Sequence, residues 1–152
     1  MTCDIRHVSY SGILEADSSA QLIAEYSAEC SIPEIGTPNP QKALYDRMES
    51  SGFMDCLGVF DHNVLVGFAT ILFYVLPHYG KKIASVESLF VAQSHRRNGT
   101  GSQLMQSIEQ AATANGCVIV LYSAPTGGQL ERVLGARKNC RRTNSVFTRN
   151  LQ

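Results

Sequence analysis

The fold of this chain is decided by residues 91–102, which are Val91-Ala-Gln-Ser-His-Arg96-Arg97-Asn98-Gly99-Thr100-Gly101-Ser102. An apolar segment ends here in a basic turn that holds two glycines. Glycine lets the backbone approach a ligand closely and adopt dihedral angles that a side chain forbids, so several N–H groups can converge on one anion. Arg96 and Arg97 add two permanent positive charges. The stretch therefore predicts a binding site for a pyrophosphate.

A helix is predicted directly after the turn. Apolar side chains recur there at helical spacing, at Leu104, Met105, Ile108, Ala111 and Ala112. Asn115-Gly116 then supplies a signal for the end of the helix. The free N–H groups and the positive dipole end of such a helix point back into the turn. Two other phosphate motifs fit poorly. A P-loop needs Lys-Ser or Lys-Thr where this chain has Ser102-Gln103, and a dinucleotide fingerprint needs another glycine in a different register.

Length and composition indicate one domain over residues 1–152. The chain is 44% hydrophobic, which is enough for a proper core. The longest apolar run, Val64 to Leu76, is interrupted and too short to span a bilayer, and the N-terminus lacks the apolar segment of a signal peptide. We therefore expect a cytoplasmic protein with no membrane partner. The five cysteines and four histidines lack metal-ligand spacing, so no metal site is expected.

The charge distribution is uneven although the net charge is zero. Residues 1–92 hold five Lys/Arg and eleven Asp/Glu, whereas residues 93–152 hold eight and two. The basic part suits a polyanionic cofactor. The acidic part either favours a cationic acceptor or is ordinary solvated surface. Nucleic acid is not expected as a partner, because the basic residues lack interleaved aromatic side chains and the whole protein is not basic.

The remaining elements follow from periodicity and turn residues. We expect a strand over Cys3–Tyr10, a helix after Asp17-Ser18-Ser19, a helix over Gln41–Ser50, a hairpin of Cys56–Asp61 and Val64–Leu76, a strand over Lys81–Ala92, a fully buried strand over Cys117–Ser123, a helix over Gln129–Leu134 closed by Gly135, and a last strand over Ser145–Leu151.

The spacing Arg96-x-x-Gly99-x-Gly101, placed after Val91, resembles the acyl-coenzyme A signature of the GNAT superfamily of N-acetyltransferases, and the order of elements is similar over essentially the whole chain. The resemblance implies an α/β (α+β) fold with a mixed, mostly antiparallel sheet of about six to seven strands flanked by about four helices. Val86 to Val91 looks most like small-amine and polyamine acetyltransferases, and Arg141 to Phe147 resembles small acetyltransferase-like proteins of bacteriophages and prophages.

The resemblance also implies how acetyl-CoA would be bound. The strand before the signature diverges from the next strand in this family. Its free N–H groups hold the pantetheine and the thioester, which here implies Leu89, Phe90 and Val91, facing Cys117–Ser123. The residues of the turn would then bind the pyrophosphate: Arg96, Arg97, Asn98, Gly99, Thr100, Gly101 and Ser102.

Glu87 is the candidate general base, since several family members carry a glutamate four residues before the position of Val91. Strand alternation would put its partly desolvated carboxylate on one face with Leu89 and Val91. The alternative is an edge glutamate paired with Lys81 or Lys82.

Many relatives place a tyrosine four residues before a helix-ending glycine, where it protonates the departing thiolate. Here that glycine is Gly135 and the matching position holds Glu131. The candidates for the general acid are therefore Ser123, Cys140 or solvent.

Glu29 and Glu34 flank the loop that lines the acceptor site in such folds, so they are candidate substrate-binding residues, with a solvated surface as the alternative. The first hypothesis is an acetyl-CoA-dependent N-acetyltransferase in which a small-molecule or protein amine attacks the thioester directly. The alternative is a catalytically weak or inactive acyl-CoA-binding protein that acts through a partner. A homodimer stays open, because dimerisation is common in the superfamily.

Overall fold

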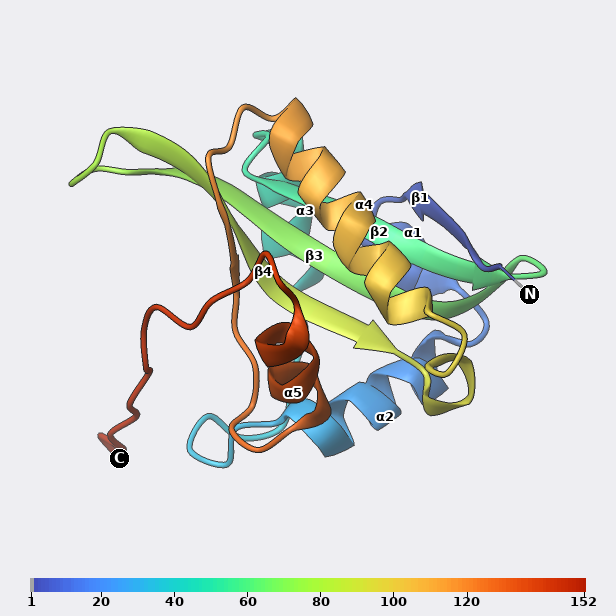
Figure 1. The fold of residues 1–152 in the computed structure, drawn as a ribbon. Coiled ribbons are helices and arrows are strands. Elements are labelled where there is room, and N and C mark those ends of the chain that lie inside the picture. Colours follow the sequence, from blue (N-terminus) through green and yellow to red (C-terminus); the bar gives the residue numbers. More distant parts are fainter. Residues whose placement is uncertain (1) are drawn as a thin grey trace.

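The computed structural model describes residues 2–152, which form a mixed sheet with helices on both faces (Figure 1). Within these residues the elements follow in the order β1 (Asp4–His7), α1 (Tyr10–Glu15), α2 (Ser19–Cys30), α3 (Lys42–Ser50), β2 (Met54–Asp61), β3 (Val64–Leu76), β4 (Lys81–Val91), a 3₁₀ turn (Gln93–His95), α4 (Thr100–Ala114), β5 (Val120–Tyr122) and α5 (Gln129–Ala136). The expected helix over 41–50, the hairpin, the strand over 81–92 and the helix after the glycine turn are confirmed within a residue or two.

The strands lie in sequence order, β1-β2-β3-β4-β5. The pairs from β1 to β4 are antiparallel, and β5 runs parallel to β4. The β2–β3 hairpin closes through His62 and Asn63, whose φ angles of 47° and 66° lie in the left-handed region. The described chain thus has five strands where six to seven were expected, and five α-helices where four were expected.

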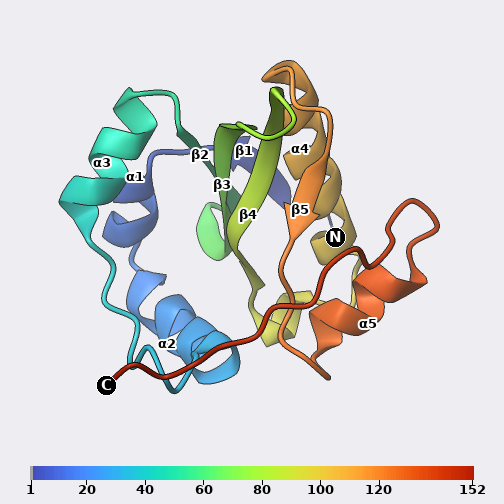
Figure 2. The same ribbon diagram turned by 90° about the vertical axis from the view of Figure 1, so that its left-hand side faces the viewer.

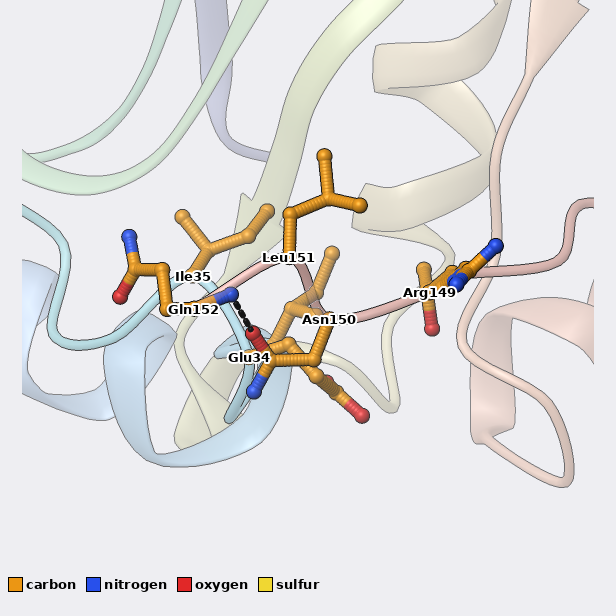
Figure 3. Close-up of a pocket in the computed structure, with 8 residues that line it drawn as sticks. Glu34, Ile35, Arg149, Asn150, Leu151 and Gln152 are labelled. Carbon is orange, nitrogen blue, oxygen red and sulfur yellow. Dashed lines mark hydrogen bonds between the residues drawn. The ribbon is translucent and has the colours of Figure 1, made fainter.

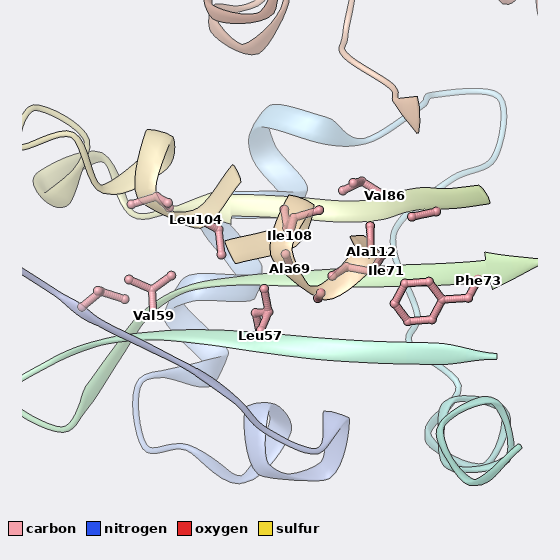
Figure 4. Close-up of a cluster of buried hydrophobic side chains, with 13 residues drawn as sticks. Leu57, Val59, Ala69, Ile71, Phe73, Val86, Leu104, Ile108 and Ala112 are labelled. Atoms are coloured by element: carbon pink, nitrogen blue, oxygen red, sulfur yellow. The ribbon is translucent and has the colours of Figure 1, made fainter. Parts of the chain in front are cut away.

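Side chains of β3 alternate between two hydrophobic clusters, one on each face of the sheet. Ala69 and Ile71 face α4 and pack with Leu104 and Ile108, all four fully buried (Figure 4). Phe68 faces the other side and packs in a second cluster under α1, α2 and α3, together with Tyr10, Ile13, Leu22, Met54 and Phe90. Figure 2 shows the sheet standing between the three N-terminal helices and α4. Both faces of the sheet are therefore covered.

The predicted strand at the N-terminus is too long. β1 ends at His7, and Ser9 caps α1 by accepting a hydrogen bond from the Gly12 N–H at 3.0 Å. Because this cap turns the chain, Tyr10 begins a helix rather than ending a strand.

The C-terminal predictions need more correction. β5 spans three residues, and Leu121 is 37% exposed, so the strand is not of the fully buried type. Gly135 lies inside α5 and does not close it. Residues 137–152 form neither helix nor strand, so the predicted strand over Ser145–Leu151 is absent, and no residue from 113 to 152 is buried. None of the helices within residues 2–152 combines the length and apolar character needed to cross a bilayer.

Candidate active site

The predicted anion site is the N-terminus of α4. Gly99 is its N-cap and has a φ of 77°, a left-handed conformation that favours glycine. Within residues 2–152, no side chain caps this helix through Gly99, and its first turn holds no acidic residue. The first N–H groups of a helix have no partner inside the helix and carry partial positive charge. The α4 N-terminus is therefore open to an anion.

The space around these glycines is open. A Cβ atom added at Gly99 or Gly101 would meet no described atom within 4 Å. The φ of Gly101 is not left-handed, so neither packing nor backbone strain within the chain demands glycine there. A ligand approaching the backbone does provide a reason. Arg97, Asn98 and Ser102 are exposed around this space. Thr100 is 2% exposed, and its hydroxyl donates to Cys3 Sγ, so it offers the ligand its backbone only.

The Arg96 side chain, which was expected to bind the pyrophosphate, makes its hydrogen bonds within the protein. Its Nε donates to the Val91 carbonyl at 2.7 Å, and its guanidinium lies over the Phe90 ring and donates to both oxygens of Glu29, at 2.7 and 2.8 Å. These bonds hold the pKa of Glu29 below its usual range. Arg96 and Glu29, expected to bind different ligands, bind each other in this structure. They thereby tie α2 to the end of β4.

The β4 strand splits from β5 where the thioester was expected. β5 pairs only with Ala84, Ser85 and Val86. From Ser88 to Val91, β4 is still paired on its other edge with β3, but this stretch has no strand partner among residues 2–152 on the β5 side. The edge of β4 along Leu89, Phe90 and Val91 is therefore open, and it leads to the 3₁₀ turn and the α4 N-terminus.

Glu87 lies at a β-bulge in this split. Thr70 pairs with Ser88 and Ile71 with Val86, which leaves Glu87 as the extra residue between them. A bulge breaks the strict alternation of a strand. Leu89 and Val91 consequently pack in the cluster beneath α4, whereas Glu87 contacts Tyr45 of α3 on the opposite face. The expected shared face of Glu87 with Leu89 and Val91 is therefore wrong, and Glu87 is exposed rather than partly desolvated.

The Glu87 carboxylate accepts two hydrogen bonds. The Tyr45 hydroxyl donates to Oε1 at 3.1 Å, and the Thr70 hydroxyl donates to Oε2. Burial, followed by the nearby Glu87 charge, raises the pKa of Tyr45, and the same two causes raise the pKa of Tyr26 to about 12. Glu87 forms no ion pair with Lys81, Lys82 or any other cation in the described part of the chain. It is an unpaired anion with hydroxyl donors around it.

Ser123 directly follows Tyr122, whose partner on β4 is Val86, so Ser123 lies where the two strands separate. It is exposed. Tyr122 itself donates to Glu109 of α4 at 3.1 Å, and burial raises its pKa. Glu131 accepts from the Gly127 N–H at 2.5 Å and pairs with Arg142. Neither Tyr122 nor Glu131 is therefore free to protonate a leaving group beside Glu87.

Glu34 lines a separate surface hollow of about 300 Å³ between residues 32–35 and the C-terminal segment (Figure 3). The other residues that line this hollow include Ile35, Arg149 and Leu151. Neither Glu87 nor any residue of the glycine turn lines it. Glu29 and Glu34 are thus not brought together. The candidate active site is therefore assigned to Glu87 and the open edge of β4. Among residues 2–152, no group of three or more candidate ligands could hold a metal ion.

Tyr45, Thr70 and Ser88 were missed at the sequence level. Tyr45 and Glu87 are 42 positions apart, and Thr70 sits within an apolar strand. The one available signal was polarity: Thr70 is the polar residue in the middle of the run Val64–Leu76 and is fully buried. Buried hydroxyls need a partner, and here that partner is the site carboxylate.

Comparison with known proteins finds the same fold in acetyltransferases. An aminoglycoside acetyltransferase from an uncultured soil metagenomic sample, in complex with sisomicin, superposes with a TM-score of 0.73 at 18% identity, covering 99% of this chain and 97% of the other. A ribosomal-protein-alanine N-acetyltransferase from Brucella melitensis superposes with a TM-score of 0.72 at 18% identity over 97% and 98%. Glucosamine-6-phosphate N-acetyltransferase from Arabidopsis thaliana gives 0.66 at 12% identity over 97% and 99%.

These identities establish the fold and leave the acceptor open. A search of curated protein sequences finds no match to this chain. Neither the structural neighbours nor the family comparison supports the finer likeness to polyamine acetyltransferases or to bacteriophage proteins. The family model that matches residues 20–131 is that of the acetyltransferase (GNAT) family, and it covers the α2 helix, the β2–β4 sheet, the glycine turn and β5. The chain belongs to the GNAT family of acetyltransferases.

Proposed function

We propose that this protein is an acetyl-CoA-dependent N-acetyltransferase that moves an acetyl group directly from the thioester to a primary amine. One observation carries the proposal: the unpaired carboxylate of Glu87 lies where β4 leaves β5, and the same open strand edge leads to the uncapped N-terminus of α4. The candidate base and the candidate anion site therefore lie along a single strand, which supports the proposal.

Different residues of the chain bind different parts of acetyl-CoA. The N–H groups at the start of α4, with Gly99 and Gly101, fit the pyrophosphate, and Arg97, Asn98 and Ser102 lie exposed beside them. The open edge of Leu89, Phe90 and Val91 fits the pantetheine and the thioester carbonyl. Backbone N–H groups fixed in a sheet need no reorganisation when negative charge develops on that carbonyl oxygen. Acetyl-CoA supplies the activated acetyl group.

Glu87 removes a proton from the acceptor ammonium, because only the neutral amine is a nucleophile. The nitrogen–carbon bond forms, the carbon–sulfur bond breaks, and the sulfur leaves with its electron pair. Ser123 lies at the split on the β5 side and is the candidate donor to that sulfur, with solvent as the alternative. No cysteine is needed as a covalent relay in this route.

The acceptor is proposed to be cationic before reaction, since Glu87 has no partner cation among residues 2–152. The names of the structural neighbours suggest a first panel of acceptors: sisomicin, a peptide with N-terminal alanine and glucosamine 6-phosphate. Spermidine adds the polyamine class. Thiol release from acetyl-CoA with each amine measures turnover.

The first experiment is a thermal melt with excess acetyl-CoA, with ATP and NAD as controls. At about 100-fold above the dissociation constant, selective binding stabilises the fold by about 2.7 kcal/mol, which raises Tm by several degrees. Glu87→Gln is then assayed on the panel. We expect kcat to fall about 100-fold or more while the acetyl-CoA-induced shift in Tm is retained. An equal shift with ATP would contradict the cofactor assignment.

A second candidate function is an acyl-CoA-binding protein without turnover that acts through a partner. The observation in its favour is that Tyr122 and Glu131 are both engaged away from Glu87. A full shift in Tm with acetyl-CoA, together with turnover that is absent for wild type and Glu87→Gln alike, would support this candidate over the enzyme.

We further propose that the protein acts in the cytoplasm and forms a homodimer through its C-terminal segment. Val146 and Phe147 are 84% and 91% exposed, and residues 137–152 hold five basic residues and no acidic one, opposite in sign to the acidic N-terminal part. Light scattering after gel filtration tests the homodimer. A monomer at micromolar concentration would contradict it.

A further inference from the structure

The α3 helix reaches the candidate base through one side chain. The Tyr45 hydroxyl donates to Oε1 of Glu87 at 3.1 Å, across 42 positions of sequence. Nothing in the proposed chemistry requires α3 to be in contact with β4. The contact therefore calls for an explanation of its own.

The second oxygen of Glu87 is held from the sheet. Thr70 on β3 donates to Oε2, and its Oγ1 lies 2.6 Å from Ser88 Oγ. A threonine hydroxyl has one proton, so when that proton points to the carboxylate, Ser88 must be the donor to Thr70. The bonds run in one direction, from Ser88 to Thr70 to Glu87. Thr70 is fully buried and Ser88 is 8% exposed, so this chain is shielded from water.

Tyr45 is itself fixed by α1. Its ring stacks on Tyr10 with centroids 3.6 Å apart. The Tyr10 N–H donates to Glu49 at 2.9 Å, and Ser11 donates to Asp46 at 3.1 Å, so α1 and α3 are joined on both sides of the stack. The Tyr45 hydroxyl thus has a defined position and is not a mobile surface group.

We propose that Tyr45 and Thr70 are positioning residues that hold the Glu87 carboxylate in one orientation to receive the acceptor ammonium. The inference rests on the proposed function of Glu87 as base. Each carboxylate oxygen accepts one of these bonds and keeps lone pairs for the amine. The two donors therefore fix the base without neutralising it as a cation would.

The other titratable groups that face Glu87 do not compete for its proton. They are Tyr10 from α1, Tyr26 from α2, Tyr45 from α3 and Cys56 from β2. Burial raises the pKa of each of these groups, so all four stay neutral near pH 7.

The test compares Tyr45→Phe and Thr70→Val with Tyr74→Phe, a matched control whose ring stacks on Phe53 outside this site. For each site variant we expect kcat with the most active panel amine to fall about tenfold. KM for acetyl-CoA and all control values should stay unchanged. In a Glu87→Gln background neither variant should reduce kcat further, because the residues act through Glu87.

A second measurement needs no acceptor. The carboxyl carbon of Glu87 is observed by NMR at neutral pH and assigned with Glu87→Gln. In Tyr45→Phe and Thr70→Val its chemical shift should change, because each variant removes a hydrogen bond to one carboxylate oxygen. Tyr74→Phe should leave the signal in place, and unchanged chemical shifts in the two site variants overturn the inference even if the enzyme is active. By contrast, full activity of Glu87→Gln would refute the proposed base, whatever the variants at Tyr45 and Thr70 show.

Discussion

The two parts of this molecule differ sharply in how they are packed. From β1 to α4, residues 4–114, both faces of the sheet are covered, and Ile71 and Ile108 are among the largest side chains that are fully buried. From residue 113 onward no side chain is buried, although β5 and α5 form there and Leu130 and Leu134 lie in α5. Hydrophobic burial scales with the apolar area removed from water, so the first part carries most of the fold's stability.

The difference shows which part of the molecule supplies each component of the candidate site. The packed part supplies rigid positions: the bulge at Glu87, the strand edge of 89–91 and the α4 N-terminus. The part from residue 113 onward contributes a short strand, a helix and an extended segment whose exposed apolar side chains are available to a ligand or a second copy. The following experiments can break or sharpen this division.

The largest effect is expected from a cavity in the packed part. Ile108→Ala should lower the free energy of unfolding by about 3 to 4 kcal/mol, because Ile108 is fully buried between α4 and the sheet. Val133→Ala in α5, at a side chain 37% exposed, should cost less than about 1 kcal/mol. Urea unfolding measures both. Similar losses would show that α5 is as well packed as α4.

Gly101→Ala should separate binding from stability. We expect acetyl-CoA affinity to fall about tenfold, because a methyl group enters the space next to the α4 N–H groups, while unfolding free energy rises by up to about 1 kcal/mol from better helix propensity. Calorimetry and urea unfolding measure the two quantities. Gly135→Ala is the control: it also has open space inside a helix, in α5, and should change stability alone. Unchanged affinity in Gly101→Ala would place the anion elsewhere.

The Arg96–Glu29 pair predicts a smaller, pH-dependent effect. Arg96 holds the pKa of Glu29 below its value in the unfolded chain, so the pair's contribution is complete above that unfolded value and is lost as pH falls through the folded one. Glu29→Gln should cost about 0.5 to 1 kcal/mol at pH 7, since the carboxylate is partly exposed and screened. Glu25→Gln, on the same helix, is the control. A loss that persisted at pH 3 would exclude the ion pair as its cause.

The smallest effect is expected from removing residues 143–152, which leaves the Arg142–Glu131 pair intact. Since these residues are exposed and outside any helix or strand, the unfolding free energy of the monomer should change by less than about 0.5 kcal/mol. Thermal melts over a range of protein concentrations measure it. A larger, concentration-dependent loss would show that the segment is buried against a second copy.

Local signals predicted part of the fold well. Hydrophobic alternation gave the β2–β3 hairpin and β4, and the glycine turn followed by helical spacing gave α4. These elements bury the faces that their periodicity marks. The strand over 145–151 has similar local character but does not form, because β propensity counts only where a partner strand and a packing surface exist. Periodicity cannot report whether such a surface is present.

For the site, the sequence by itself determined the glycine turn at Gly99 and Gly101 that opens α4, and it singled out Glu87 as a candidate, since both depend on residue type at short spacing. Only the tertiary structure decided that Glu87 faces α3, that Arg96 pairs with Glu29, and that Tyr45 and Thr70 donate to the Glu87 carboxylate. One extra residue at a bulge reverses the face of a strand, and a contact across 42 positions leaves no trace in local pattern. Long-range packing sets both.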